Sequence, residues 1–314
     1  MQLFTFKEDI NFLKLRLPAA ILSVLLVCGS IFLLATKGLN WGLDFTGGTV
    51  IEVSYQQPAE LDPIRDLLKR EGFGEPTVQH FGTSRDVMIR MEPQQGAKAE
   101  TLGDRILSAL RQEASGEVTL KRIDFVGPNV GDELTEQGGL AVIVALLCIL
   151  LYVSLRFEWK LAVGSVVALA HDVTITLGFF SLLGIEFDLT VLAAVLTVVG
   201  YSLNDTIVVF DRIRENFRKI RKGDVAEITN NALTATLSRT MMTSLTTLFV
   251  VVAIFAKGGP VIHAFAAALL MGITVGTFSS IYVASSVALK LGLCKEDLMP
   301  PQVEKEGADH EPLL

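Results

Sequence analysis

Side chains that catalyse reactions or hold metals are scarce in this chain. Among 314 residues there are three cysteines, Cys28, Cys148 and Cys294, and only four histidines. They form no Cys-x-x-Cys pair and no Cys/His cluster, so neither a disulfide framework nor a zinc site is indicated. His-Glu-x-x-His, Gly-x-Ser-x-Gly and Walker motifs are also missing. We therefore predict a protein that is not an enzyme, has no metal site and needs no cofactor.

Charged residues are scarce too. Only 19% of the residues are charged, half are hydrophobic, and the mean hydropathy is +0.48. A typical soluble domain has about 25% charged residues. The net charge is −7, and no basic patch is interleaved with aromatic residues, which argues against a nucleic-acid partner. The composition indicates an integral membrane protein, in contact with lipid, that has a modest water-exposed part.

Long hydrophobic runs, by contrast, are abundant. A helix needs about 20 apolar residues to cross a bilayer. Lys and Arg concentrate in alternate loops, so the positive-inside rule places both termini in the cytoplasm. The first run is longer than a usual signal-peptide core and lacks a cleavage site, so we expect it to be retained. The six predicted spans are Leu17–Ala35, Gly138–Leu155, Leu161–Leu183, Leu189–Val209, Ser238–Ala256 and Ala264–Leu289.

This topology divides the chain into five parts. We expect a cytoplasmic N-terminus (1–16), a first span (17–35), an exported α+β domain (36–137), five further spans (138–289) with a basic cytoplasmic loop (210–237), and a tail (290–314). The tail is rich in Pro and Glu, and we predict that it is disordered.

The exported segment shows alternating strand patterns and two amphipathic helix patterns. Their order is β-α-β-β-α-β, which is the ferredoxin-like arrangement. The predicted fold class is therefore a membrane all-α six-helix bundle with an α+β ferredoxin-like domain. The expected strands are Thr49–Tyr55, Thr77–Phe81, Asp86–Glu92 and Glu117–Phe125, and the expected helices are Leu61–Glu71 and Ala99–Glu113.

Two Gly-rich stretches flank this domain, Gly42–Thr49 and Gly127–Leu134. The first lacks the Gly-Lys-Ser/Thr ending of a phosphate-binding loop. We predict that both are tight turns that hold the soluble domain close to the membrane. Glu186 and Asp188, in the short loop between spans three and four, are expected to be solvated.

Span four contains an amide and a carboxylate, Asn204 and Asp205, within its apolar run. A carboxylate there costs roughly 2.5–3.5 kcal/mol on insertion scales, so its default interpretation is functional. Arg239, at the start of span five, reaches a similar depth, and we expect it to pair with Asp205. Two interpretations remain open. The pair is either a static link between helices or a site that loads and releases a proton.

Spans three and six carry small residues every four positions, a spacing typical of closely packed membrane helices. In span six the stripe includes Gly272 and Gly276. In span three it includes Asp172, which follows His171 near mid-membrane. An ionisable group inside the membrane is by default a candidate functional residue, so both residues are candidates for a proton pathway. The alternative is that they only contribute to helix packing.

Four long motifs carry a resemblance to a known family. They are Gly42-Leu-Asp-Phe-Thr-Gly-Gly-Thr49, Val126-Gly-Pro-Asn-Val-Gly-Asp-Glu-Leu134, the run Gly200–Asn216, and Leu237-Ser-Arg-Thr240. With these motifs the chain resembles bacterial SecF proteins of the SecD/SecF family, in the resistance-nodulation-division superfamily, over nearly its whole length. The family-motif turns are then assigned to Gly42, Asp44, Gly47, Gly48, Gly127, Pro128 and Gly131.

The resemblance implies a subunit of a bacterial inner-membrane translocase whose α+β domain is periplasmic. Such proteins are thought to use the proton-motive force to promote preprotein export after the ATP-driven step of SecA. The implied partners are SecD, which completes a pseudo-symmetric twelve-span unit, the SecYEG channel, YajC and the unfolded preprotein. Protons are the implied coupling ion, and the family's proton-linked Asp and Arg match Asp205 and Arg239.

Two other functional classes remain open at this point. One is a scaffold that stabilises the translocon without conducting protons. The other is a half-transporter for lipids or small molecules in the same superfamily, although the exported segment has no clear apolar cleft pattern.

Overall fold

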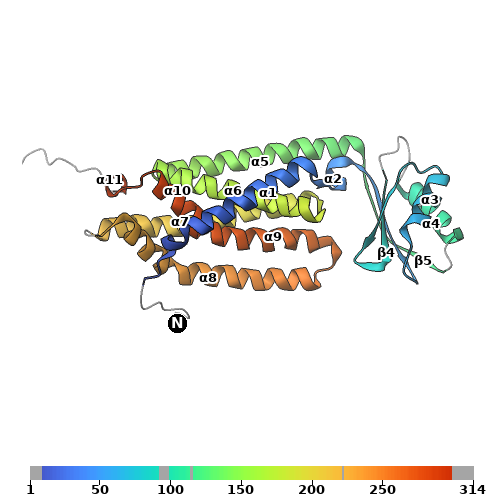
Figure 1. Cartoon of the computed structure of the whole chain (residues 1–314). Helices are drawn as coiled ribbons and strands as arrows, with labels where there is room; N and C mark the ends of the chain where they lie inside the picture. The colour runs from blue at the N-terminus through green and yellow to red at the C-terminus, as the bar shows by residue number, and fades with distance from the viewer. Residues whose placement is uncertain (1–8, 92–98, 114–115, 221–222, 299–314) are drawn as a thin grey trace, which may run out of the picture.

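A computed structural model describes residues 9–91, 99–113, 116–220 and 223–298. Six long helices lie side by side in one bundle, and a small α+β domain extends from one end of it (Figure 1). Each of the six is long and apolar enough to cross a membrane, which confirms the predicted number of spans. They are α1 (Arg16–Thr36), α5 (Pro128–Arg156), α6 (Trp159–Leu183), α7 (Leu189–Lys219), α8 (Val225–Lys257) and α9 (Pro260–Ser279), which continues through the π-helix η2 (Ser280–Ala284) into α10 (Ser285–Lys290).

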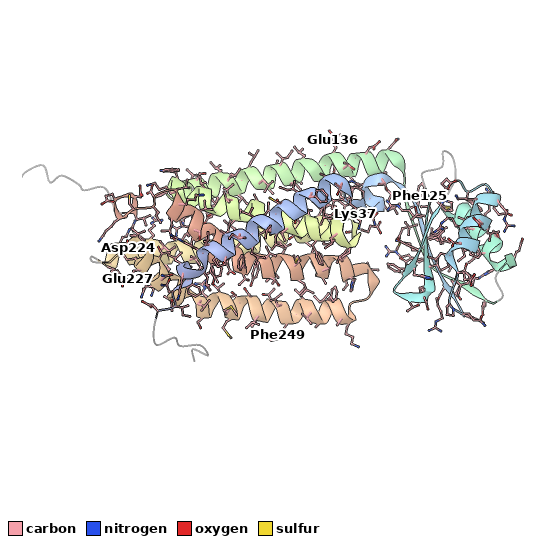
Figure 2. All side chains as sticks on the ribbon, in the orientation of Figure 1. Lys37, Phe125, Glu136, Asp224, Glu227 and Phe249 are labelled. Carbon is pink, nitrogen blue, oxygen red and sulfur yellow. The ribbon has the colours of Figure 1, made fainter. Side chains whose placement is uncertain are left out.

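The surface of the bundle is apolar along its middle and charged near its ends. Phe249 projects outward from α8 with 70% of its surface exposed (Figure 2). In the same view Asp224 and Glu227 mark one end of the bundle, and Lys37 and Glu136 lie towards the other. An apolar belt between charged ends is the pattern that a bilayer stabilises.

Three of these helices extend well beyond the apolar runs that identified them. Helix α5 begins at Pro128, α7 continues to Lys219, and α8 begins at Val225. The segment 210–237, expected as a basic cytoplasmic loop whose charged cluster after Asp211 forms an amphipathic helix, is helical over most of its described residues. The apolar run marks the part of a helix that lipid or protein covers, whereas its charged continuation folds as helix in water.

The chain after α10 packs against the bundle. Leu293 and Leu298 are 4% and 2% exposed, and α11 (Lys295–Leu298) ends this part. Lys160 Nζ lies 2.6 Å from Asp297 Oδ2 and fixes α11 to the start of α6. The prediction of disorder was thus wrong for residues 290–298, and 299–314 lie outside the described residues.

The N-terminal segment lies at the same end of the bundle as α11 (Figure 1). A short 3-10 helix, η1 (Phe12–Leu15), buries Phe12 and Leu13 before α1 begins. The Leu13 backbone N–H donates to Asn230 Oδ1 of α8 at 3.1 Å.

The α+β domain contains one four-stranded antiparallel sheet with the order β3-β4-β2-β5. Helices α3 (Leu61–Arg70) and α4 (Ala99–Glu113) cover one face of it (Figure 1). This confirms the ferredoxin-like prediction. The strands are β2 (Gly48–Tyr55), β3 (Thr77–Phe81), β4 (Thr83–Met91) and β5 (Val118–Val126). The core is formed by alternate strand residues such as Ile51 and Val53, both fully buried.

A second, two-stranded sheet joins the α+β domain to the bundle. In it β1 (Asn40–Trp41) pairs in parallel with β6 (Glu186–Phe187), which lies in the turn between α6 and α7. The four-residue helix α2 (Leu43–Thr46) follows β1. The chain thereby connects two segments that are about 145 positions apart in sequence.

Candidate functional site

Helix α6 turns its small-residue face inward and carries a carboxylate with it. Asp172 is 1% exposed, and the residues on the same face are all buried, namely Gly164, Ala168 and Thr176. Helices α7 and α9 pack against this face. Small side chains allow close approach of the helices, so the Asp172 carboxylate reaches residues of both neighbours.

Asp172 has a hydrogen bond to each of its two oxygens. Oδ2 accepts from Ser202 Oγ of α7 at 2.5 Å and from Ser279 Oγ of α9 at 2.7 Å. Oδ1 lies 2.8 Å from His171 Nδ1. Among the described residues, no Lys or Arg forms an ion pair with this carboxylate. Helices α6, α7 and α9 thus meet at one buried acid. Among the described residues, His171 is the one basic side chain paired with it.

Two glycines make this meeting point compact. A Cβ on Gly276 would lie 3.1 Å from Ser202 Cβ and 3.5 Å from Asp172 Oδ2, and a Cβ on Gly272 would clash with the side chain of Val198. Larger residues here would separate α9 from α7. The predicted packing glycines therefore lie in the same seam as the acid.

His171 is 7% exposed, and its Nε2 atom has no hydrogen-bond partner among the described residues. Its Nδ1 can donate to an ionised Asp172 or accept from a protonated one, depending on the tautomer. The imidazole and the carboxyl group therefore form one buried hydrogen-bonded pair.

The π-helical turn η2 begins immediately after Ser279. Such turns interrupt α-helices mostly as single insertions and are frequent at functional sites. The Ala284 carbonyl of this turn lies 2.7 Å from the position that a Cβ on Gly164 would occupy. The irregular part of the last span thus packs on the same face of α6 as Ser279.

Asp205 lies one turn beyond Ser202 on α7, and its surroundings differ. It is 3% exposed, but its Oδ2 atom has no hydrogen-bond partner among the described residues. Ser244 of α8 is close enough to interact with the carboxylate, and its hydroxyl also shares a 2.7 Å hydrogen bond with Thr277. Asp205 is therefore a buried acid with an incomplete set of partners.

Arg239 acts on Asp205 electrostatically from α8, but the two side chains form no direct ion pair. The expected close pairing is therefore not present, and the interpretation as a static link between helices has no contact to support it. Arg239 is instead exposed on the bundle surface, as is Asn204 of α7. Asn204 thus lies on a different face of the helix from the carboxylate.

The hydroxyl groups near this acid are also incompletely bonded. Tyr201 Oη on α7 and Thr240 Oγ1 on α8 are both buried without a hydrogen-bond partner among the described residues. Buried polar groups usually have partners, and each exception requires an explanation. Here the exceptions lie on the two helices that carry Asp205 and Arg239.

Sequence reasoning did not identify Ser202 and Ser279 as partners of Asp172. Ser202 lies three residues before Asp205, on the same side of α7. Ser279 lies one position before Ser280, which belongs to the small residues repeated every four positions in the last span. In the sequence, Ser279 is only a hydroxyl-bearing residue three positions after Gly276. This position does not predict contact with an acid unless the packing of the helices is known.

At the other end of the bundle, the first Gly-rich motif forms a short helical turn. Gly42 precedes α2, and Gly47 and Gly48 follow it with φ values of +64° and +119°, which favour glycine. Asp44 Oδ2 accepts from the Leu189 backbone N–H at 3.0 Å. The carboxylate of this motif thereby satisfies an N–H group at the start of α7.

The second Gly-rich motif begins a helix and was wrongly predicted to be a turn. Gly127 precedes α5 as its N-cap, and Pro128 is the first residue of the helix. Gly131 lies within α5, where an added Cβ would be 3.0 Å from the Gly47 backbone nitrogen. The two motifs therefore pack against each other by close backbone approach.

Glu186 and Asp188 were expected to be solvated, and both make specific contacts. Glu186 Oε1 accepts from the Leu43 backbone N–H at 3.3 Å. Asp188 Oδ1 accepts from the Val191 N–H at 2.7 Å and caps α7. The short loop between α6 and α7 is therefore held in place by its own carboxylates.

Comparison with known proteins identifies the family. Residues 106–293 match the family described as "Protein export membrane protein SecD/SecF, C-terminal", and residues 32–59 match the "SecD/SecF GG Motif". The chain belongs to the SecD/SecF family. It is 61% identical to a protein translocase subunit SecF of Vibrio alginolyticus over 99% of this chain and 98% of that one. A SecF of Escherichia coli O157:H7 is 52% identical, over 93% and 91% of the two chains.

Solved structures of SecDF share the fold. The crystal structure of SecDF, a translocon-associated membrane protein from Thermus thermophilus, matches with a TM-score of 0.82 and 38% identity. SecDF in its super-membrane-facing form matches with a TM-score of 0.67 at the same identity. Each match covers 92% of this chain but only 39% of the SecDF chain. The SecD/SecF chain described here is thus similar to the SecF-type part of a larger SecDF protein.

These matches establish the general class of the protein. By family it is a protein-export translocase subunit, a transport protein and not a catalytic enzyme. It is a multi-pass membrane protein with six candidate spans. The solved structures that it matches are those of SecDF proteins.

Proposed function

We propose that this chain is the SecF-type subunit that, with SecD, uses the proton-motive force to promote preprotein translocation after the SecA step. The observation that carries the proposal is the buried Asp205 carboxylate, whose Oδ2 atom has no partner among the described residues. An intramembrane acid that is neither ion-paired nor fully hydrogen-bonded is free to exchange a proton. A proton that crosses the membrane releases about 2.3 kcal/mol per 100 mV, which can bias a conformational equilibrium.

The proposed mechanism begins with the charge of Asp205. When it is ionised, the positive charge of Arg239 attracts it across the α7–α8 interface. When it is protonated, that attraction is lost, and α8 and α7 can repack. The change of helix packing then moves the α+β domain, which we place in the periplasm and expect to hold the emerging chain.

His171 and Asp172 form the second part of the proposed proton pathway. Ser202 donates to Asp172 and lies one helical turn from Asp205 on α7. A change of charge at either acid therefore alters the packing of the same helix. Asn204, which faces outward, contributes to the pathway only through an adjoining subunit in this proposal.

The outward polar groups support the partner assignment. Asn204 and Arg239 are exposed on the isolated bundle, and no atom lies within 4 Å of the Cβ position of Gly200. Exposing an arginine and an amide to lipid is costly, whereas a second helix bundle can cover them. We therefore assign this face to SecD and propose the SecYEG channel, YajC and the unfolded preprotein as further partners. The location is the bacterial inner membrane, with both termini cytoplasmic.

Export measured with and without a proton gradient, after the ATP-driven step, tests the proposal. Asp205→Asn should insert, associate with SecD and lose all gradient-stimulated export. Asp211→Asn is a matched control, because Asp211 lies on the same helix in an exposed ion pair with Arg156. Full gradient-stimulated export by Asp205→Asn would refute the role of this acid. Loss of export only together with loss of SecD association would favour a scaffold that conducts no protons.

A further inference from the structure

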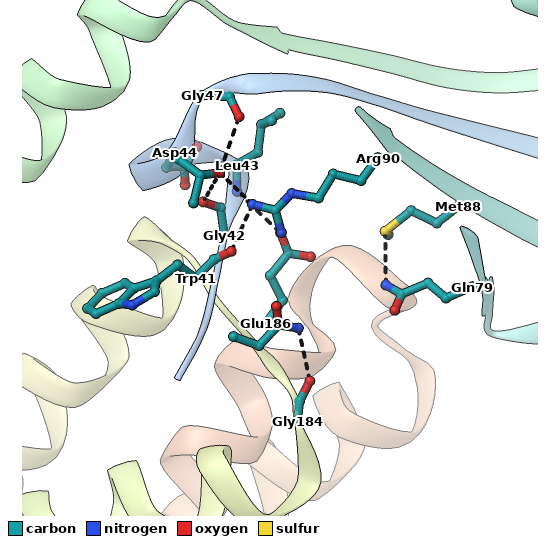
Figure 3. Close-up of polar contacts among 12 residues, drawn as sticks. Trp41, Gly42, Leu43, Asp44, Gly47, Gln79, Met88, Arg90, Gly184 and Glu186 are labelled. Carbon is teal, nitrogen blue, oxygen red and sulfur yellow. Dashed lines mark hydrogen bonds and ion pairs between the residues drawn. The ribbon is translucent and has the colours of Figure 1, made fainter. Parts of the chain in front are cut away.

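One arginine of the α+β domain has several polar partners outside its sheet, beside the apolar contact of Leu43 with Val50 and Met88. Arg90 lies near the end of β4, and its side chain is 21% exposed. Its Nη2 donates to the Trp41 carbonyl at 2.8 Å and to Thr46 Oγ1 at 2.5 Å. Its Nη1 lies 3.5 Å from Glu186 Oε1. Figure 3 shows the guanidinium between these groups.

The partners of Arg90 belong to three segments outside the four-stranded sheet. Trp41 is in β1, Thr46 is in α2, and Glu186 is in β6, between α6 and α7. Glu186 Oε1 also accepts from the Leu43 N–H, so the same oxygen joins α2 to β6. One guanidinium therefore ties β4 to both sides of the two-stranded sheet. A planar fork of donors is suited to this role, whereas a single ammonium group is not.

Glu186 connects this contact to the helices of the proposed proton pathway. It lies between the end of α6, which carries His171 and Asp172, and the start of α7, which carries Asp205. The first N–H of α7 is also bonded to Asp44 of α2. A shift of α6 or α7 along its axis therefore moves Glu186 together with α2, and Arg90 passes the movement to β4.

Within the parts of the chain that the structure describes, other ion pairs of the α+β domain stay inside it. Lys121 pairs with Asp86, and Arg122 pairs with Asp124. Both pairs join residues of the four-stranded sheet, in β4 and β5. They supply matched controls for loss of a charged pair in the same sheet.

We propose that Arg90 is a positioning residue that couples movement of α6 and α7 to the α+β domain through Glu186, Trp41 and Thr46. This inference rests on the proposed proton-driven function and names the contact that transmits it. Without Arg90, the domain stays attached through its two chain connections and the two-stranded sheet, but its sheet no longer follows the helices. Proton exchange in the bundle then continues without movement of the domain.

Distances between spin labels test the coupling in the full chain with SecD in vesicles. The native cysteines Cys28, Cys148 and Cys294 are first replaced by alanine. One label pair joins the domain to the bundle, at Arg85→Cys and Leu183→Cys, which are both exposed positions. A second pair reports the bundle alone, at Leu155→Cys on α5 and Lys219→Cys on α7, which are also exposed.

The expected result separates the two proposals. In the otherwise native chain, both distances change when a proton gradient is applied, and Asp205→Asn abolishes both changes. In Arg90→Ala only the bundle distance changes, and gradient-stimulated export falls to the level measured without a gradient. Arg90→Lys retains part of the change in the domain-to-bundle distance, because it keeps the positive charge but loses the planar, forked set of N–H donors. Arg122→Ala leaves both responses intact.

Two outcomes would contradict these proposals in different ways. If the domain distance still changes fully in Arg90→Ala, the coupling role of Arg90 is wrong, while the proton-driven function stands. If neither distance depends on the gradient in the native chain, the proposed function itself fails. An equal loss in Arg122→Ala would show that the sheet needs its surface charges for folding and that Arg90 has no special role.

Discussion

The two buried acids of the bundle lie on neighbouring helices and differ in how their oxygens are bonded. Asp172 accepts two serine hydroxyls and contacts His171, whereas Asp205 keeps one oxygen without a partner. A satisfied buried network rigidifies its surroundings, but an unsatisfied group retains the cost of its desolvation. The contrast indicates that Asp172 links three helices, whereas the proposed proton exchange belongs to Asp205, which has the incomplete set of partners.

Removal of the Asp172 side chain should produce the largest loss of stability. Asp172→Ala leaves the Ser202 hydroxyl and a histidine nitrogen unpaired, at about 1–3 kcal/mol for each buried group, while Ser279 keeps the Gly276 carbonyl as an acceptor. Asp205→Ala removes an acid that lacks a complete set of partners, so it should cost much less. Thermal unfolding of the two purified variants in detergent measures the difference. Equal destabilisation would remove the distinction between the two acids.

Asp172→Asn sharpens the same test, because it keeps the size and one acceptor oxygen. If it folds and exports with full gradient dependence, Asp172 is a packing residue. If it folds but loses gradient dependence, Asp172 belongs to the proton pathway.

Single serine deletions should have intermediate effects. Ser202→Ala and Ser279→Ala each remove one hydrogen bond to the Asp172 carboxyl group, which is worth roughly 0.5–3 kcal/mol. The double variant should cost less than the sum, since both donors share Oδ2. Unfolding of the two single variants and the double variant gives the interaction energy. Strict additivity would show that the two hydroxyls act independently.

Glu186, a carboxylate outside the membrane-spanning segments, provides a pH-dependent stability to compare with that of the two buried acids. Burial raises the pKa of Glu186 above its ordinary value of 4.5, while Arg90 opposes the shift and Asp188 and Asp44 add to it. Because the pKa is higher in the folded arrangement, the resulting stabilisation is complete below the unfolded pKa. It is lost as the pH rises through the folded pKa.

The junction between domain and bundle should therefore be more stable at mildly acidic pH than at neutral pH. Glu186→Gln resembles the protonated form and should remove this dependence. With Trp159→Phe, Trp41 remains as the single tryptophan, and it packs against Phe45 and Phe187. Its fluorescence during denaturant titrations at several pH values reports the junction. Weaker stability in acid would show that attraction to Arg90 outweighs burial.

The smallest effect is expected at Tyr201. Its hydroxyl is buried without a hydrogen-bond partner among the described residues, so Tyr201→Phe removes a polar atom without breaking a hydrogen bond to them. The change in unfolding free energy should stay within about 0.5 kcal/mol or be stabilising. A larger loss in the complex with SecD than in the isolated chain would indicate that the partner supplies the missing acceptor.

Much of the architecture was predictable from local patterns. Six apolar runs correctly predicted six spans, and alternating residues around Ile51 and Val53 predicted the ferredoxin-like sheet. These features depend on the periodicity of neighbouring residues, which sequence shows directly. The ends of α7 and α8 were less predictable, because a helix that leaves the membrane keeps its backbone pattern but loses its apolar signal.

The sequence by itself determined which ionisable groups enter the membrane, since Asp172 and Asp205 stand within apolar runs. Only the tertiary structure decided how they differ. Asp172 accepts a hydrogen bond from Ser279, 107 positions away in the chain, whereas Arg239 is exposed and forms no ion pair with the buried Asp205. Likewise, the partnership of Arg90 with Glu186 depends on a sheet formed by distant segments. Hydrogen bonds act over about 3 Å, so their partners are fixed by helix packing and not by spacing along the chain.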